Sequence, residues 1–161
     1  MSTHIPEMLF PVSGSKPVTT NGGVTCDYIS LKNAVKCWAV IHLTQAVGHA
    51  TAFTVERATA VAGTGHVAIA NVVPIWYGNV STASNALTRQ TDAVSFTMDV
   101  GVTGEAYIIF QIDPESLGST YDCITVVSAN SGQATNIWDV TYWLQPKYPA
   151  AVANQLSFIA D

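Results

Sequence analysis

The chain has 161 residues, of which 11% are charged and 48% are hydrophobic, and its formal net charge is −5 at pH 7. This length fits one domain, and the hydrophobic share excludes a disordered chain. Six Lys and Arg against eleven Asp and Glu, with no basic cluster, argue against a nucleic-acid partner. Because no apolar run approaches the roughly 20 residues of a spanning helix, we expect no membrane partner.

Residues 1–23 are predicted to form an extended N-terminal arm. Pro6, Pro11 and Pro17 interrupt any helix or central strand, and Asn21 begins a glycine-rich turn. The apolar side chains of the arm would prefer a partner to water and are therefore candidate partner contacts: Ile5, Met8, Leu9 and Phe10.

Eight segments after the arm are predicted to be strands because their side chains alternate with a period of two and turn residues separate them. They are residues 24–31, 34–45, 49–61, 67–76, 94–100, 105–113, 121–128 and 135–145. Residues 77–92 lack this period and are expected to form a long loop. The pattern predicts an all-β protein, an antiparallel two-sheet sandwich over residues 24–148, followed by a C-terminal tail at 149–161. An eight-strand sandwich favours a jelly roll, and an immunoglobulin-like sandwich is the alternative.

The residues that could carry chemistry do not form a recognisable motif. His42 and His49 are separated by a predicted turn, and Glu56 lies an odd number of residues beyond His49, so a cupin-type metal site is not expected. No nucleophile elbow is present, and the three cysteines have no zinc-ligand spacing. We therefore expect no catalytic residues, no metal and no cofactor, and the protein is not expected to be an enzyme.

The aromatic residues suggest a binding surface instead. Trp38 and Trp138 are expected to fill the core. Trp76 and Tyr77 open the long loop, and Trp143 lies opposite the core face of its strand, so these three are candidate surface contacts. Their spacing leaves open whether the partner is a protein or, as in a carbohydrate-binding β-sandwich module, a sugar.

Several segments together resemble a known group of proteins. They are residues 37–45, 52–59, 73–76, 87–92, 110–114 and 121–124. Within residues 24–148 the chain is similar to small proteins encoded in the head-gene clusters of tailed phages and prophages, which are virion structural proteins of the capsid decoration or cement type. The resemblance implies a location on the capsid exterior, the host cytoplasm during assembly, and the major capsid protein as partner. It implies no catalytic residues.

The composition agrees with a structural role. A weakly charged sandwich with a partly apolar arm fits a cement protein that bridges major capsid subunits and stabilises the shell, and it also fits a phage tail or fibre protein. Because so few charges leave neutral surface exposed, we expect a homo-oligomer, either a homodimer or a homotrimer.

Overall fold

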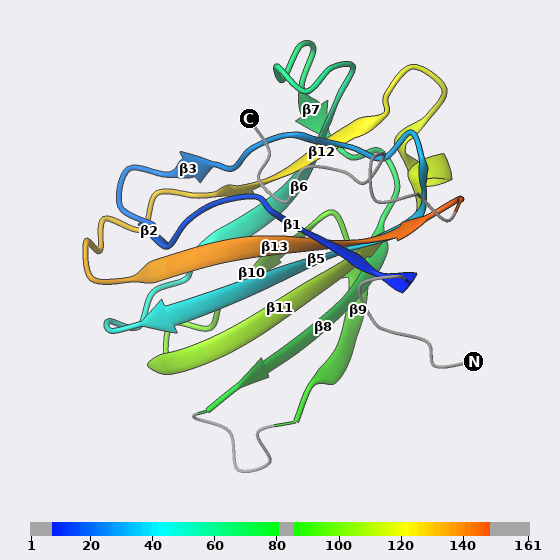
Figure 1. Cartoon of the computed structure of the whole chain (residues 1–161). Coiled ribbons are helices and arrows are strands. Elements are labelled where there is room, and N and C mark those ends of the chain that lie inside the picture. The colour runs from blue at the N-terminus through cyan, green and yellow to red at the C-terminus, as the bar shows by residue number, and fades with distance from the viewer. Residues whose placement is uncertain (1–7, 81–85, 149–161) are drawn as a thin grey trace.

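In the computed structural model, residues 8–80 and 86–148 are described. They fold into two antiparallel β-sheets that face each other, and the chain crosses repeatedly from one sheet to the other (Figure 1). The predicted all-β, two-sheet sandwich is confirmed. No helix in this part of the chain is long and apolar enough to cross a membrane.

Sheet A has the spatial order β1-β13-β5-β11-β8-β9, and β2 also pairs with β13. Its strands are β1 (Phe10–Ser13), β2 (Val18–Thr19), β5 (Ala34–Gln45), β8 (Val73–Asn79), β9 (Thr88–Ala93), β11 (Gly104–Ile112) and β13 (Ile137–Pro146). Sheet B has the order β10-β6-β12-β3, with β4 paired to β12 and β7 to β6. Its strands are β3 (Val24–Thr25), β4 (Ile29–Ser30), β6 (Ala52–Ala58), β7 (Val67–Ala68), β10 (Ser95–Thr97) and β12 (Cys123–Ser128). A 3-10 helix, η1 (Pro114–Leu117), follows β11.

The strand order is that of a jelly roll. The eight principal strands in chain order are β1, β3, β5, β6, β10, β11, β12 and β13, and the chain places them in the two sheets as A, B, A, B, B, A, B and A. The four-stranded orders β1-β13-β5-β11 and β10-β6-β12-β3 complete the double Greek key. The hairpin of β8 and β9, inserted between β6 and β10, widens sheet A beyond β11. An immunoglobulin-like sandwich orders its strands differently.

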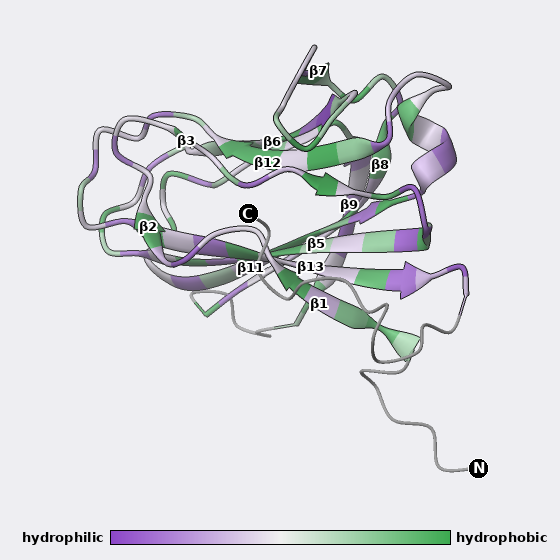
Figure 2. Ribbon diagram, turned by 45° about the horizontal axis from the view of Figure 1, so that its top comes forward, coloured by the Kyte–Doolittle hydropathy of each residue, from purple (hydrophilic) through white to green (hydrophobic). Residues whose placement is uncertain are grey.

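The core lies between the sheets and follows from the period of two in the strands (Figure 2). Two side chains of β13 reach across it. The ring of Trp138 meets Phe53 of sheet B edge to face, with ring centroids 5.0 Å apart. The hydroxyl oxygen of Tyr142 accepts a hydrogen bond from the backbone N–H of Val126, at 3.1 Å. Both contacts fix the position of one sheet over the other.

The structure differs from the predicted arm. Phe10 to Ser13 form β1, which pairs with β13 from Leu144 to Thr141, so the sandwich begins well before residue 24. Gly14 permits this pairing, because a Cβ atom there would lie 2.2 Å from Cε2 of Tyr142. Pro11 hid the strand in the sequence, but at a sheet edge a missing N–H is tolerated.

The predicted long loop also contains ordered strand. Residues 77–79 belong to β8, and Thr88–Ala93 form β9 at the edge of sheet A. Since β9 is polar on both faces, its sequence carries no period-two hydrophobic signal. The remaining part of the loop, residues 81–85, and the predicted tail, residues 149–161, lie outside the described residues.

Candidate interaction surface

The outward side of sheet A forms a broad surface of rings and aliphatic side chains. Strand register places the outward side chains of neighbouring strands next to one another in rows that run across the sheet. We call the outward side chains of β13, β5, β11 and β8 the aromatic face. Its larger ring and aliphatic members are Trp38, Val40, Trp76, Tyr107, Ile109, Ile137 and Trp143, of which Tyr107 is 44% and Ile137 37% exposed and the others are half-buried.

The central row of the aromatic face is formed by four consecutive pairings. Thr141 pairs with Val40, Val40 with Ile109, and Ile109 with Trp76. Trp76 then pairs with Arg89 of β9, whose guanidinium carbon lies 4.9 Å from the indole centroid. The cation thus covers one end of an otherwise uncharged row.

The next row brings two tryptophans together. Trp143 of β13 pairs directly with Trp38 of β5, and Pro11 of β1 flanks the pair. Trp38 was expected to fill the core, and this expectation is wrong. It follows Cys37 and precedes Ala39, both of which are buried, so alternation turns its side chain outward. Trp138 does fill the core, as predicted.

The third row combines rings with a carboxylate. The imidazole of His42 stacks on the ring of Tyr107, with centroids 4.8 Å apart and an interplanar angle of 21°. On its other side, Nδ1 of His42 lies 3.6 Å from a carboxylate oxygen of Asp139. This row gives the aromatic face a hydrogen-bonding edge.

Charged groups lie toward the margin of the aromatic face, where two ion pairs form and Glu105 of β11 is exposed. Nζ of Lys36 lies 3.5 Å from a carboxylate oxygen of Asp113. Arg89 forms an ion pair with Asp92 on the same strand. Since these charges lie toward the margin, the middle of the face offers mainly apolar and aromatic contact, which is the composition of a protein interface core.

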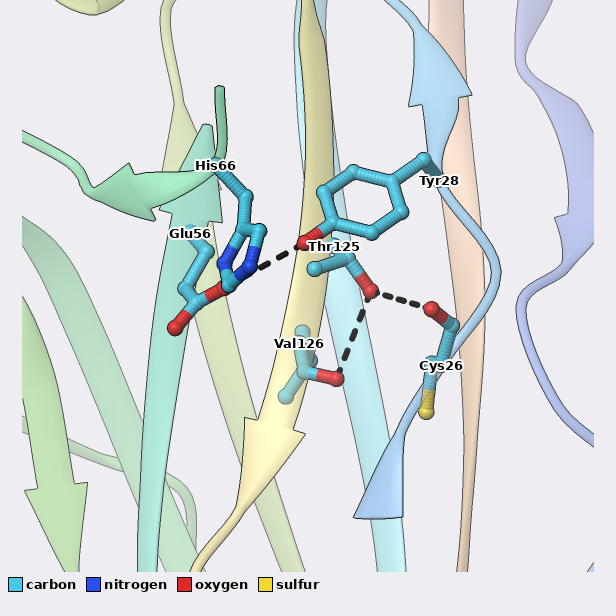
Figure 3. Close-up of polar contacts among 6 residues, drawn as sticks. All are labelled: Cys26, Tyr28, Glu56, His66, Thr125 and Val126. Carbon is cyan, nitrogen blue, oxygen red and sulfur yellow. Dashed lines mark hydrogen bonds and ion pairs between the residues drawn. The ribbon is translucent and has the colours of Figure 1, made fainter. Parts of the chain in front are cut away.

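The outward side of sheet B is different in character. A carboxylate oxygen of Glu56 accepts a hydrogen bond from the hydroxyl of Tyr28 at 3.3 Å and lies 2.9 Å from Nδ1 of His66 (Figure 3). The hydroxyl of Thr125, which pairs with Glu56 across the strands, donates to the backbone oxygen of Cys26 at 2.7 Å. Burial, and then the carboxylate of Glu56, raise the pKa of Tyr28 to about 12. The polar groups of this side therefore bind one another.

The predicted contact residues do not all reach the surface. Trp76 and Trp143 lie on the aromatic face, as predicted. Tyr77 was expected to be a surface contact, but it points inward, where its ring centroid lies 4.8 Å from that of Phe96. Adjacent residues of one strand face opposite ways, so Trp76 and Tyr77 could not both point outward.

The four candidate partner contacts of the N-terminal segment also have different outcomes. Phe10 packs against the core opposite Leu144, so its interpretation as a free contact is wrong. Met8 is 54% exposed and Leu9 is half-buried, so both remain available to a partner. Ile5 lies outside the described residues.

The described residues offer little for covalent or metal chemistry. In residues 8–80 and 86–148, no group of three or more His, Cys, Asp or Glu side chains is placed to hold a metal ion. Cys26, Cys37 and Cys123 are buried and free. Burial raises the pKa of the Cys26 and Cys123 thiols to about 12, and it raises that of Cys37 further. These thiols are therefore protonated at neutral pH, which makes them poor nucleophiles.

Comparisons with known proteins give likenesses among solved structures alone. No family model and no curated protein matches the chain. The crystal structure of the SPBc2 prophage-derived protein YomS is similar at a TM-score of 0.48 and 9% identity, over 84% of this chain and 91% of that one. A chain of the infectious bursal disease virus Gt strain structure is similar at a TM-score of 0.17 and 10% identity, over 92% of this chain and 42% of that one. The fold assignment stands on the strand order of this chain.

Proposed function

We propose that the protein is a non-enzymatic virion structural protein of a tailed phage. In this role it decorates the outside of the capsid and bridges major capsid subunits. The observation that carries the proposal is the aromatic face: a jelly roll presents rings and aliphatic side chains outward, and its central row and tryptophan row have no charged side chain on β13, β5, β11 or β8. Such a surface is suited to burial against protein. The segments that resemble decoration proteins support the same role.

Bridging has a simple physical benefit for a shell. An expanded capsid is a thin layer that holds packaged DNA under pressure, and separation of its subunits is resisted by any protein that binds across their boundary. A clip that engages several subunits at once gains from effective concentration, so weak individual contacts suffice. A rigid sandwich transmits the load without deforming.

Purified full-length protein can be mixed with expanded shells that lack it, followed by electron cryomicroscopy and calorimetry. We expect stoichiometric density on the outer surface and a raised melting temperature of the shell. Density confined to the tail of the virion would instead support the tail or fibre alternative, and an absence of binding would contradict both.

The structure also indicates how to test the N-terminal segment. Deleting residues 1–12 would remove most of β1, so loss of binding could reflect damage to the sandwich. Deleting residues 1–7 keeps every described strand, and Met8→Glu changes a side chain that is 54% exposed. If the segment grips the shell, these two variants lose shell binding while keeping the wild-type melting temperature.

One observation favours a carbohydrate-binding module as a second candidate. Trp38 and Trp143 lie side by side on an outward sheet face, where indole rings could stack on a sugar. A glycan array would show saturable binding that Trp143→Ala abolishes. The aliphatic Val40 and Ile109 beside the rings fit a protein partner better, because a sugar needs hydrogen-bonding groups there.

A further inference from the structure

We infer that the aromatic face is a homotypic interface, in which two copies of the chain pack face to face about a two-fold axis. This inference concerns the free protein and does not depend on shell binding. It assigns a surface and a symmetry to the oligomer that the composition predicts. The same face carries the proposal of shell binding, and one copy cannot use it for both contacts at once. The dimer is therefore the state of the free protein, and it must open before this face meets the shell.

The distribution of charge over the aromatic face suits contact with a second copy of the chain. Its central row and its tryptophan row contain no formally charged side chain on β13, β5, β11 or β8. Both signs occur away from these two rows, as the Lys36–Asp113 and Arg89–Asp92 pairs, with Asp139 beside His42 and an exposed Glu105. A face of this kind meets its own copy without strong repulsion across the contact, although each chain carries a net charge of −5. A strongly charged partner would find no complementary field there.

The size of the aromatic face also suits a dimer interface. Four strands at a spacing of about 4.8 Å, each contributing some eight residues at about 3.3 Å, span roughly 500 Å² in projection. The flanking strands β1 and β9 extend this area, and side-chain relief increases it further. A stable interface needs about 800 Å² per partner, so the face has the required scale.

The shape of a sheet face favours contact between two copies over contact among three. A broad sheet face buries its whole width only against one other broad face, as sheets do within a sandwich, at a separation of about 10 Å. Three such faces around an axis would meet only at their edges. The aromatic face therefore favours a two-fold dimer over a trimer, and an isologous contact closes the assembly.

The test is sedimentation equilibrium of the full-length protein across micromolar concentrations. We expect a mass of about 34 kDa, twice the 17.1 kDa of one chain. Tyr107→Glu would place two like charges in the contact and should weaken dimerisation by about 100-fold or more. The matched control is Val67→Glu, because Val67 is 43% exposed and Tyr107 is 44% exposed, and Val67 lies on β7 of sheet B.

Tryptophan fluorescence provides a second readout. Three of the four tryptophans lie on the aromatic face, so acrylamide quenching of wild-type protein should weaken as dimer forms. If Tyr107→Glu fails to fold by circular dichroism, Thr141→Lys in the central row replaces it.

Four results would overturn the inference. They are a wild-type monomer at the highest concentration, a trimer, a dimer that Val67→Glu disrupts instead, or a folded Tyr107→Glu variant that dimerises normally. A monomeric wild type whose shell binding is lost on Tyr107→Glu would assign the face to the capsid. Shell binding by a monomeric Tyr107→Glu variant would leave the dimer inference standing and would mean that the shell binds a surface other than the aromatic face.

Discussion

The two outward sides of the sandwich differ in how their side chains are satisfied. On sheet B, Tyr28, Glu56 and His66 bind one another, and the hydroxyl of Thr125 donates to the backbone. On sheet A, Trp143, Trp38 and Ile109 lie in continuous rows and remain partly open to water. One sequence thus encodes a side whose polar groups bind one another and a side whose rings and aliphatic side chains are left partly open to water. The two sides differ in where their aromatic side chains lie more than in how many they have.

The largest expected effect separates a core tryptophan from a surface one. Trp138→Ala removes a ring that is 1% exposed and packs on Phe53, so the free energy of unfolding should fall by about 3–5 kcal/mol. Trp143→Ala, on the aromatic face, should cost about 1 kcal/mol or less. Urea denaturation at low protein concentration measures both. Equal losses would contradict the assignment of Trp143 to the surface.

The packing of the β1 end of sheet A against the core depends on Gly14. A methyl group there would lie 2.2 Å from Cε2 of Tyr142 and 2.8 Å from Cγ1 of Val140. Gly14→Ala should therefore lower the free energy of unfolding by about 1–3 kcal/mol. The control is Gly101→Ala, whose new Cβ atom would approach only Oδ1 of Asp99, at 3.6 Å. The control should shift the melting temperature little, and a similar shift in both variants would refute the packing argument.

The polar side of sheet B should show its own pH dependence. The pKa of Tyr28 is raised to about 12 by burial and then by Glu56, against an ordinary value of 10.0. The folded state therefore holds the phenol proton more tightly, and this stabilisation is complete below pH 10 and is lost as the pH rises toward 12. Tyr28→Phe should flatten the stability profile in this window, as thermal melts at several pH values can test.

The variant Glu56→Gln tests how much of the raised pKa of Tyr28 comes from the carboxylate of Glu56. Because burial is the larger cause, this variant should lower the pKa of Tyr28 only part of the way toward its ordinary value. Ultraviolet titration of the tyrosines, with Tyr28→Phe identifying the contribution of Tyr28, measures the shift. An unchanged pKa would mean that the carboxylate of Glu56 has no part in it.

The smallest expected effect concerns the cation over the aromatic face. Arg89→Gln removes an exposed contact with Trp76 and should cost about 0.5–1 kcal/mol. Arg57→Gln should cost more, because the guanidinium of Arg57 lies 4.1 Å from the Tyr121 centroid and also donates to the carbonyl of Leu117. Differential scanning calorimetry can rank the two variants. A larger loss of stability in Arg89→Gln than in Arg57→Gln would contradict this ranking of the two contacts.

Much of the fold could be predicted because alternation is a local signal. Residues 34–45, 105–113 and 135–145 were expected as strands and nearly coincide with β5, β11 and β13. The strand β9 could not be found this way because Arg89 and Asp92 leave it polar on both faces. The strand β1 is short and contains Pro11, so its signal is equally weak.

The interaction surface was harder to predict than the strands. Alternation alone places Trp38 and Trp143 opposite the core faces of their strands, and it excludes Trp76 and Tyr77 from a common face. Their meeting in rows depends on pairings between strands far apart in the sequence, such as β13 with β5. No local pattern contains that register, so the continuous surface is visible only in the folded chain.

The two edges of sheet A also bear on fibril formation. An open edge strand is a template on which further chains can add as in amyloid. Here β1 has Pro11, which lacks an N–H group, and β9 carries the Arg89–Asp92 ion pair. Both edges thus discourage endless strand addition. The protein would then tolerate high concentration with little risk of growing into insoluble fibres.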